Sequence, residues 1–148
     1  MSAPFASVDE LLADARSRLT RLEPDEAYGE VLAGALIVDI RPAWQRGHEG
    51  EIPGSIIVER NHLEWRLHPG SDARVPLAAE EQRWIVVCSE GYTSSLAADA
   101  LLSLGIPATD IVGGFTAWQA AGRPTTHGGT PIEHVVPGER TSGTRAGP

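Results

Sequence analysis

The chain has 148 residues, 41% of them hydrophobic and 22% charged, which is typical of one globular domain that needs no disulfide or structural metal to fold. Its formal net charge of −8 argues against non-specific binding to nucleic acid and against docking on an anionic membrane. With a single cysteine, no apolar segment long enough to span a membrane and no secretory-signal pattern, we expect a cytoplasmic protein.

Two helices are predicted at the start of the chain. Residues 7–10 have the capping-box pattern, and apolar residues then recur at helical spacing, which predicts a helix over residues 8–19. Residues 23–26 open a second helix that ends near Gly34, because proline and acidic residues favour a first turn. We expect residues 1–20 to form an N-terminal helix that packs on the following domain.

Strands alternate with helices along the rest of the domain, which spans residues 21–125. Apolar runs rich in branched residues predict buried strands over residues 35–40, 56–58, 84–88 and 110–112. Helical patterns cover residues 61–67 (capped by Asn61), 94–104 and 115–121. This alternation predicts an α/β fold, a central parallel sheet with helices on both faces.

A change of composition marks the end of the domain. From residue 126 onward Gly, Pro, Thr and Ser dominate, and few residues can form a core. We therefore expect residues 126–148 to form a flexible C-terminal tail that contributes little to folding.

Cys88 lies where a predicted buried strand meets a predicted helix, with Gly91 in the connecting loop. Successive loop amides can form an anion-binding cup, and the helix N-terminus adds partial positive charge. Both favour the thiolate, the reactive form of cysteine, and parallel sheets place ligand sites at the carboxyl ends of their strands. The pattern predicts a nucleophile that faces the amides of residues 89–94. The alternative is an inert cysteine buried in the core.

Four segments give the chain a resemblance to the rhodanese-like (sulfurtransferase) domain over about residues 20–125. Leu36–Pro42 resembles a strand ending in Asp-x-Arg, and Gly47–Ser55 resembles a Gly-His-Ile-Pro-Gly-Ala stretch with Glu49-Gly50-Glu51 inserted. Cys88–Thr93 resembles the Cys-x-x-Gly-x-(Arg/Thr/Ser) loop, and Val112–Trp118 the closing Gly-Gly-x-x-Ala-Trp signature. Residues 58–67 are similar to members of actinobacterial type. The resemblance implies a three-layer rhodanese-like fold with about five strands.

The resemblance also implies an activity. Cys88 would take the outer sulfur of a small donor as a persulfide and pass it to a thiol, a cyanide-type nucleophile or a protein acceptor. No metal and no cofactor would take part, and neither nucleic acid nor a membrane is an expected partner. The active-site loop would consist of Ser89, Glu90, Gly91, Tyr92, Thr93 and Ser94.

Several side chains have two interpretations. Arg41 contacts the donor's negative group or forms a structural salt bridge, while Asp39 is read as a structural acceptor that holds loop amides. Arg60 and Arg66 could form a second wall of the pocket, but they also fit the solvent face of a short helix.

The loop composition bears on the choice of function. Glu90 puts negative charge where thiosulfate-active relatives often carry a basic residue, which disfavours thiosulfate and leaves open a binding module without turnover. A phosphatase or arsenate reductase on the same scaffold is disfavoured, because the sixth loop residue is Thr93 and no arginine lies between Cys88 and Gly122 to clamp phosphoryl oxygens.

Overall fold

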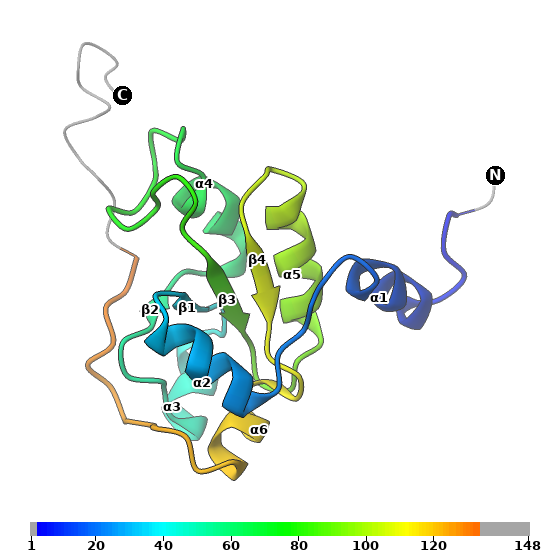
Figure 1. Cartoon of the computed structure of the whole chain (residues 1–148). Coiled ribbons are helices and arrows are strands. Elements are labelled where there is room, and N and C mark those ends of the chain that lie inside the picture. Colours follow the sequence, from blue (N-terminus) through cyan, green and yellow to red (C-terminus); the bar gives the residue numbers. More distant parts are fainter. Residues whose placement is uncertain (1–2, 134–148) are drawn as a thin grey trace.

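A four-stranded parallel sheet is the middle layer of the computed structural model, which describes residues 3–133 (Figure 1). The strands lie in the order β2-β1-β3-β4. Their bounds are β1 Leu36–Asp39, β2 Ile56–Ile57, β3 Trp84–Val87 and β4 Ala108–Asp110. β1 and β3 are therefore the central strands, and their carboxyl ends lie at the same edge of the sheet.

Six α-helices and one 3-10 helix surround the sheet in the described part of the chain. They are α1 Val8–Arg16, α2 Pro24–Leu32, α3 Ala43–Glu49, the 3-10 helix η1 Arg60–His62, α4 Leu63–Leu67, α5 Thr93–Leu102 and α6 Gly114–Ala120.

Two separate apolar cores cover the two faces of the sheet. Val38 and Val86 face one core, which includes buried residues of α4 and α5. Their neighbours Ile37 and Ile85 face the other core, which includes Phe115 of α6. Successive strand residues point to opposite faces, so both faces must be covered, and the predicted three-layer α/β architecture is confirmed.

The sheet has four strands where about five were expected. Leu22 makes an isolated parallel bridge to Ile111, beside β4 at the edge of the sheet. The pairing stops there because α2 begins at Pro24, which has no backbone N–H for a ladder. Asn61 also differs from its predicted capping role: it lies inside η1, and His62 is the N-cap residue of α4.

The N-terminal helix packs beside α5 (Figure 1). Its N-cap is Ser7, whose hydroxyl accepts a 3.1 Å hydrogen bond from the amide of Glu10. Arg18, just beyond the helix, forms a salt bridge of 2.7 Å with Asp99 of α5. The helix ends at Arg16, earlier than predicted, and the following residues lead to the bridge at Leu22.

Residues 126–133 pack against the domain through backbone pairing. Thr126 and Glu51 pair their backbones, and Ile132 pairs with Ile57 beside the edge strand β2. The prediction of a flexible tail from residue 126 is therefore wrong for this stretch, because backbone pairing at a sheet edge needs no apolar composition. The rest of the predicted tail, residues 134–148, lies outside the described residues.

No helix within residues 3–133 has the length and apolar character needed to cross a membrane.

Candidate active site at the Cys88 loop

Cys88 directly follows β3, at the carboxyl end of a central strand. Its side chain is 5% exposed, and its Sγ accepts a 3.2 Å hydrogen bond from the amide of Gly91. The sulfur thus faces a loop amide, and Cys88 also lines a pocket of about 390 Å³. The other lining residues are Gln45, Glu49, Ser89, Glu90, Tyr92 and Thr93.

The loop after Cys88 packs backbone to backbone against the Gly113-Gly114 turn. Gly91 has a φ of +87°, and a Cβ there would lie 2.9 Å from the nitrogen of Gly113. A Cβ on Gly114 would lie 2.6 Å from the carbonyl oxygen of Cys88. Only glycine permits this approach at these positive φ values, which explains why the two glycine motifs occur together.

The first turn of α6 binds two carbonyl groups of the loop. The amide of Phe115 donates to the carbonyl oxygen of Cys88 at 2.8 Å, and the amide of Thr116 donates to that of Ser89 at 3.0 Å. Because the carbonyl and N–H of a planar trans peptide point in opposite directions, these bonds turn the following amides away from α6. The Gly113-Gly114 turn and the start of α6 therefore fix the conformation of the loop at its first two residues.

Arg41 is bound inside the protein rather than exposed to the pocket. Its guanidinium is 1% exposed, donates to both carboxylate oxygens of Asp39, and also bonds Glu49 and the carbonyl of Gly50. It also lies over the ring of Phe115, 4.4 Å from the centroid. Burial works to lower the pKa of Arg41, but the hydrogen bonds and charge of Asp39 and Glu49 outweigh it and raise the pKa above its ordinary value.

These contacts decide between the two interpretations of Arg41. The structural salt bridge is present, and the side chain is 1% exposed with four of its five guanidinium N–H donors bound inside the protein, which leaves little of it to contact a donor. Asp39 is buried and accepts hydrogen bonds from the guanidinium of Arg41 and, at 3.1 Å, from its backbone amide.

Arg60 and Arg66 also lie away from the pocket, so their proposed place in its wall is wrong. Arg60 pairs with Glu64 one helical turn later, at 2.9 Å. Arg66 pairs with Glu133 and donates to the carbonyl of Ala73. Neither side chain lines the pocket that contains Cys88.

The sequence did not single out Glu49 and Asp110, which support the loop from two sides. Glu49 accepts a 2.8 Å hydrogen bond from the hydroxyl of Ser89. Asp110 is fully buried and accepts hydrogen bonds from the hydroxyls of Ser94 and Ser95, at 2.8 and 2.7 Å. The two serines thus fix the start of α5. The sequence predicted a strand that begins at Asp110, over residues 110–112, whereas β4 ends there.

The pocket at Cys88 is electrostatically unusual for an anion site. Within the described residues, its lining contains the carboxylates of Glu49 and Glu90 and no arginine or histidine, and the chain has no lysine. An anionic ligand would meet the loop amides and the N-terminus of α5 but also this negative charge.

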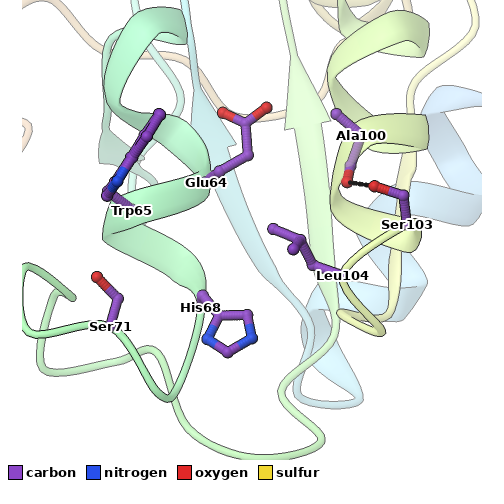
Figure 2. A pocket seen from close by; sticks show the side chains of 7 residues that line it. All are labelled: Glu64, Trp65, His68, Ser71, Ala100, Ser103 and Leu104. Atoms are coloured by element: carbon purple, nitrogen blue, oxygen red, sulfur yellow. Dashed lines mark hydrogen bonds between the residues drawn. The ribbon is translucent and has the colours of Figure 1, made fainter.

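A larger hollow of about 540 Å³ lies elsewhere, between α4 and the end of α5 (Figure 2). Figure 2 shows the indole of Trp65 and the side chains of His68 and Leu104 around it. Its carboxylate, Glu64, is already paired with Arg60. We place the chemistry at the smaller pocket, because it holds the nucleophile. No group of three or more His, Cys, Asp or Glu side chains within residues 3–133 is arranged to hold a metal ion.

Comparison with solved structures relates the chain to several bacterial and archaeal proteins. A protein of unknown function from Rhodopseudomonas palustris, described as a possible tyrosine phosphatase, is 31% identical, with a TM-score of 0.74 over 84% of this chain and 98% of that one. A rhodanese-related protein from Thermoplasma volcanium is 22% identical, with a TM-score of 0.60 over 73% of this chain and 98% of that one.

A thiosulfate sulfurtransferase from Pseudomonas aeruginosa is 24% identical, with a TM-score of 0.60 over 78% of this chain. The chain spans only 21% of that enzyme, so this likeness shows the fold alone. A search of curated proteins gave no significant match. A comparison with known families matches residues 23–121 to the rhodanese-like domain, two thirds of the sequence. The chain therefore belongs to the rhodanese-like domain family.

Proposed function

We propose that the protein is a sulfurtransferase that carries sulfur as a persulfide on Cys88. The thiolate attacks the outer sulfur of a donor, the donor's S–S bond breaks, and the donor leaves as a thiolate. An acceptor thiolate then attacks the outer sulfur of the Cys88 persulfide and releases the Cys88 thiolate. Both steps transfer a sulfur atom without a net oxidant or reductant, and neither needs a metal or a cofactor.

One observation carries this proposal: the sulfur of Cys88 lines a pocket and accepts a hydrogen bond from the amide of Gly91 at 3.2 Å. An N–H donor at this place stabilises a thiolate, and the same cup can hold the outer sulfur of a persulfide. The remaining residues of the loop, from Ser89 to Ser94, shape that cup in this account.

The charge around the pocket favours a donor without two negative charges. At 5–6 Å and an effective dielectric constant of 20, one like charge costs about 3 kcal/mol, and less when it is exposed. Glu90 is exposed and Glu49 is partly compensated by Arg41, so the repulsion is moderate, but no basic side chain of the pocket lining offsets it. We therefore propose a neutral or singly charged persulfide donor, with a small thiol or a protein cysteine as acceptor, in the cytoplasm.

Two other functions remain as outcomes of the test. A binding module that recognises a partner or an anionic metabolite without turnover is the first, and the lack of basic residues at the pocket favours the partner over the anionic metabolite. A phosphatase is suggested by the description of the Rhodopseudomonas palustris protein. The loop argues against the phosphatase, because its sixth residue is Thr93 and it offers no guanidinium to the equatorial oxygens of a phosphoryl group. The similarity of residues 58–67 to actinobacterial members is also kept as a proposal.

Intact mass, together with assays of ligand binding and of phosphate release, separates these functions. The protein is incubated with a small organic persulfide, with thiosulfate and with an aryl phosphate, and then desalted. We expect the wild-type protein to gain one sulfur atom from the persulfide, and Cys88→Ser to gain none. Binding without any gain of sulfur supports the module, and release of phosphate that requires Cys88 supports the phosphatase.

A further inference from the structure

The carbonyl oxygen of Gly91 accepts hydrogen bonds from two arginines of the N-terminal segment. Arg16 Nη2 donates to it at 2.7 Å, and Arg21 Nη2 donates at 3.0 Å. Both residues precede the stretch that matches the family, residues 23–121. An element outside the matched domain therefore reaches the centre of the candidate loop.

Each arginine is fixed at a second point, so the contact with Gly91 is not a loose surface bond. Arg21 also bonds both oxygens of the buried Asp110, with its Nε 2.8 Å from Oδ1. Arg16 Nε donates to the hydroxyl of Ser95 at 3.1 Å, and its guanidinium lies over the ring of Tyr92, 5.8 Å from the centroid. Ser95 in turn donates to Asp110.

We call Arg16 and Arg21 together the clamp. The clamp binds the part of the loop with the greatest conformational freedom. Gly91 has a φ of +87° and the widest conformational freedom of any residue type, yet its amide is the donor to Cys88 Sγ. α6 binds the carbonyls of Cys88 and Ser89, which leaves the peptide between Gly91 and Tyr92 to be fixed by other groups. Because this peptide is planar, arginines that hold its carbonyl also set the direction of the Tyr92 N–H, which points away from them.

We infer that the N-terminal segment, residues 8–22, is a working part of the active site, and that Arg16 and Arg21 are positioning residues. They hold the Gly91 carbonyl so that the amides of Gly91 and Tyr92 stay aimed for the reacting sulfur. The inference rests on the proposed sulfur transfer for its functional meaning, but the geometric part of it can be tested without any turnover.

Arg16 is the residue to test, because removal of Arg21 would leave the carboxylate of Asp110 buried without its cation. Arg16→Gln removes the shorter of the two arginine hydrogen bonds to the Gly91 carbonyl and leaves the 3.0 Å bond from Arg21. Arg18→Gln is the matched control, since it breaks the salt bridge to Asp99 at the same α1–α5 contact but touches no loop atom. Arg16→Lys keeps a positive donor of similar length and serves as the conservative variant.

The first readout is amide hydrogen exchange at Gly91 and Tyr92, which needs no sulfur donor. We expect exchange there to be about tenfold faster in Arg16→Gln, unchanged in Arg18→Gln and intermediate in Arg16→Lys, while the sheet amides stay protected in all three. If Arg16→Gln unfolds, exchange at Gly91 and Tyr92 is compared between Arg16→Lys and Arg18→Gln, and only the former should be faster than in the wild type. Equal exchange at Gly91 in these variants and the wild type would overturn the inference.

The second readout is the rate of Cys88 persulfide formation as a function of donor concentration. We expect the maximal rate of Arg16→Gln to fall about tenfold while the half-saturating donor concentration stays the same, because the loop amides are misaligned but the pocket is intact. Rates equal to those of Arg18→Gln would overturn the positioning role. A wild-type protein that takes no sulfur would refute only the proposed function. The hydrogen-exchange result would then still test whether Arg16 positions the loop.

Discussion

The hydroxyl of Ser89 donates a 2.8 Å hydrogen bond to Glu49 Oε2, which joins the loop of the candidate nucleophile to the end of α3. The other oxygen of Glu49 accepts from Arg41 at 2.9 Å. Glu49 thus has a partner on each oxygen, whereas Glu90 forms no ion pair with any of residues 3–133. The two carboxylates of the pocket differ in consequence: one is structural, and the other is an exposed charge that a donor would meet.

Charge reversal at Glu90 should therefore change the choice of donor. We expect Glu90→Lys to increase transfer from thiosulfate and to leave transfer from a neutral persulfide nearly unchanged. About 1.4 kcal/mol for each of the two unit steps of charge, after screening, corresponds to about tenfold per step. The measurement is the rate of sulfur transfer with each donor at low and high salt, and the gain should shrink at high salt.

Glu80→Lys is the control for net charge, because Glu80 is exposed and lies on the segment that enters β3, away from its carboxyl end. It should leave both rates unchanged. An equal effect of Glu90→Lys on charged and neutral donors would mean that Glu90 acts through the shape of the loop.

The close contact between Gly114 and the loop predicts a severe effect of one added methyl group. Gly114→Ala places a Cβ 2.6 Å from the carbonyl oxygen of Cys88 at a φ of +61°. Gly122→Ala is the matched control, because its φ is +75° but nothing lies within 4 Å of the added Cβ. Backbone strain alone costs about 1–2 kcal/mol, and overpacking adds about 1–3 kcal/mol.

Urea unfolding of the two variants separates the cost of backbone strain from the cost of overpacking. We expect Gly122→Ala to lose only the strain energy and to keep sulfur loading of Cys88, and Gly114→Ala to lose more stability and its loading. Equal losses of stability would show that the loop can move away from α6.

The buried position of Arg41 predicts a structural rather than a substrate effect. Arg41→Gln leaves the buried Asp39 without its cation, and such a break typically costs about 3–5 kcal/mol. Arg60→Gln removes a partly exposed pair one helical turn apart and should cost about 0.5 kcal/mol. Thermal and urea unfolding measure both. A stable Arg41→Gln protein that requires a higher donor concentration would restore the donor-contact interpretation.

The hydrogen bonds and ion pairs of Glu133 lead us to expect that the protein loses stability in acid. Burial of Glu133 works to raise its pKa, but hydrogen bonds from Arg66, the amide of Glu59 and His62 outweigh it, so the pKa lies below the ordinary value of 4.5. A carboxyl with a lowered folded pKa contributes stability that is present above pH 4.5 and is lost as the pH falls through the folded value.

Unfolding free energies measured from pH 6 downward should therefore fall less steeply for Glu133→Gln than for the wild type. Glu30→Gln, which removes the exposed partner of Arg83, is the control and should follow the wild-type slope. Parallel curves for Glu133→Gln and the wild type would show that residues 126–133 do not hold this ion pair in solution.

Local patterns predicted the alternation of strands and helices and the position of Cys88, because each depends on residues close together in the sequence. Partners of the arginines could not be predicted in this way. Arg41 and Arg66 look like anion-binding groups in the sequence, but their donors are taken by Asp39 and by Glu133, the latter 67 residues away. Composition likewise says nothing about whether residues 126–133 pair with a sheet edge.

The most direct test of sulfur transfer through Cys88 follows the sulfur atom itself. A persulfide donor with an isotopically labelled outer sulfur is mixed with the protein, and then with a thiol acceptor. We expect the label to appear first on the peptide that contains Cys88 and then on the acceptor, and Cys88→Ser to block both steps. Label that never reaches Cys88, or that reaches the acceptor equally well with Cys88→Ser, would contradict sulfur transfer through Cys88.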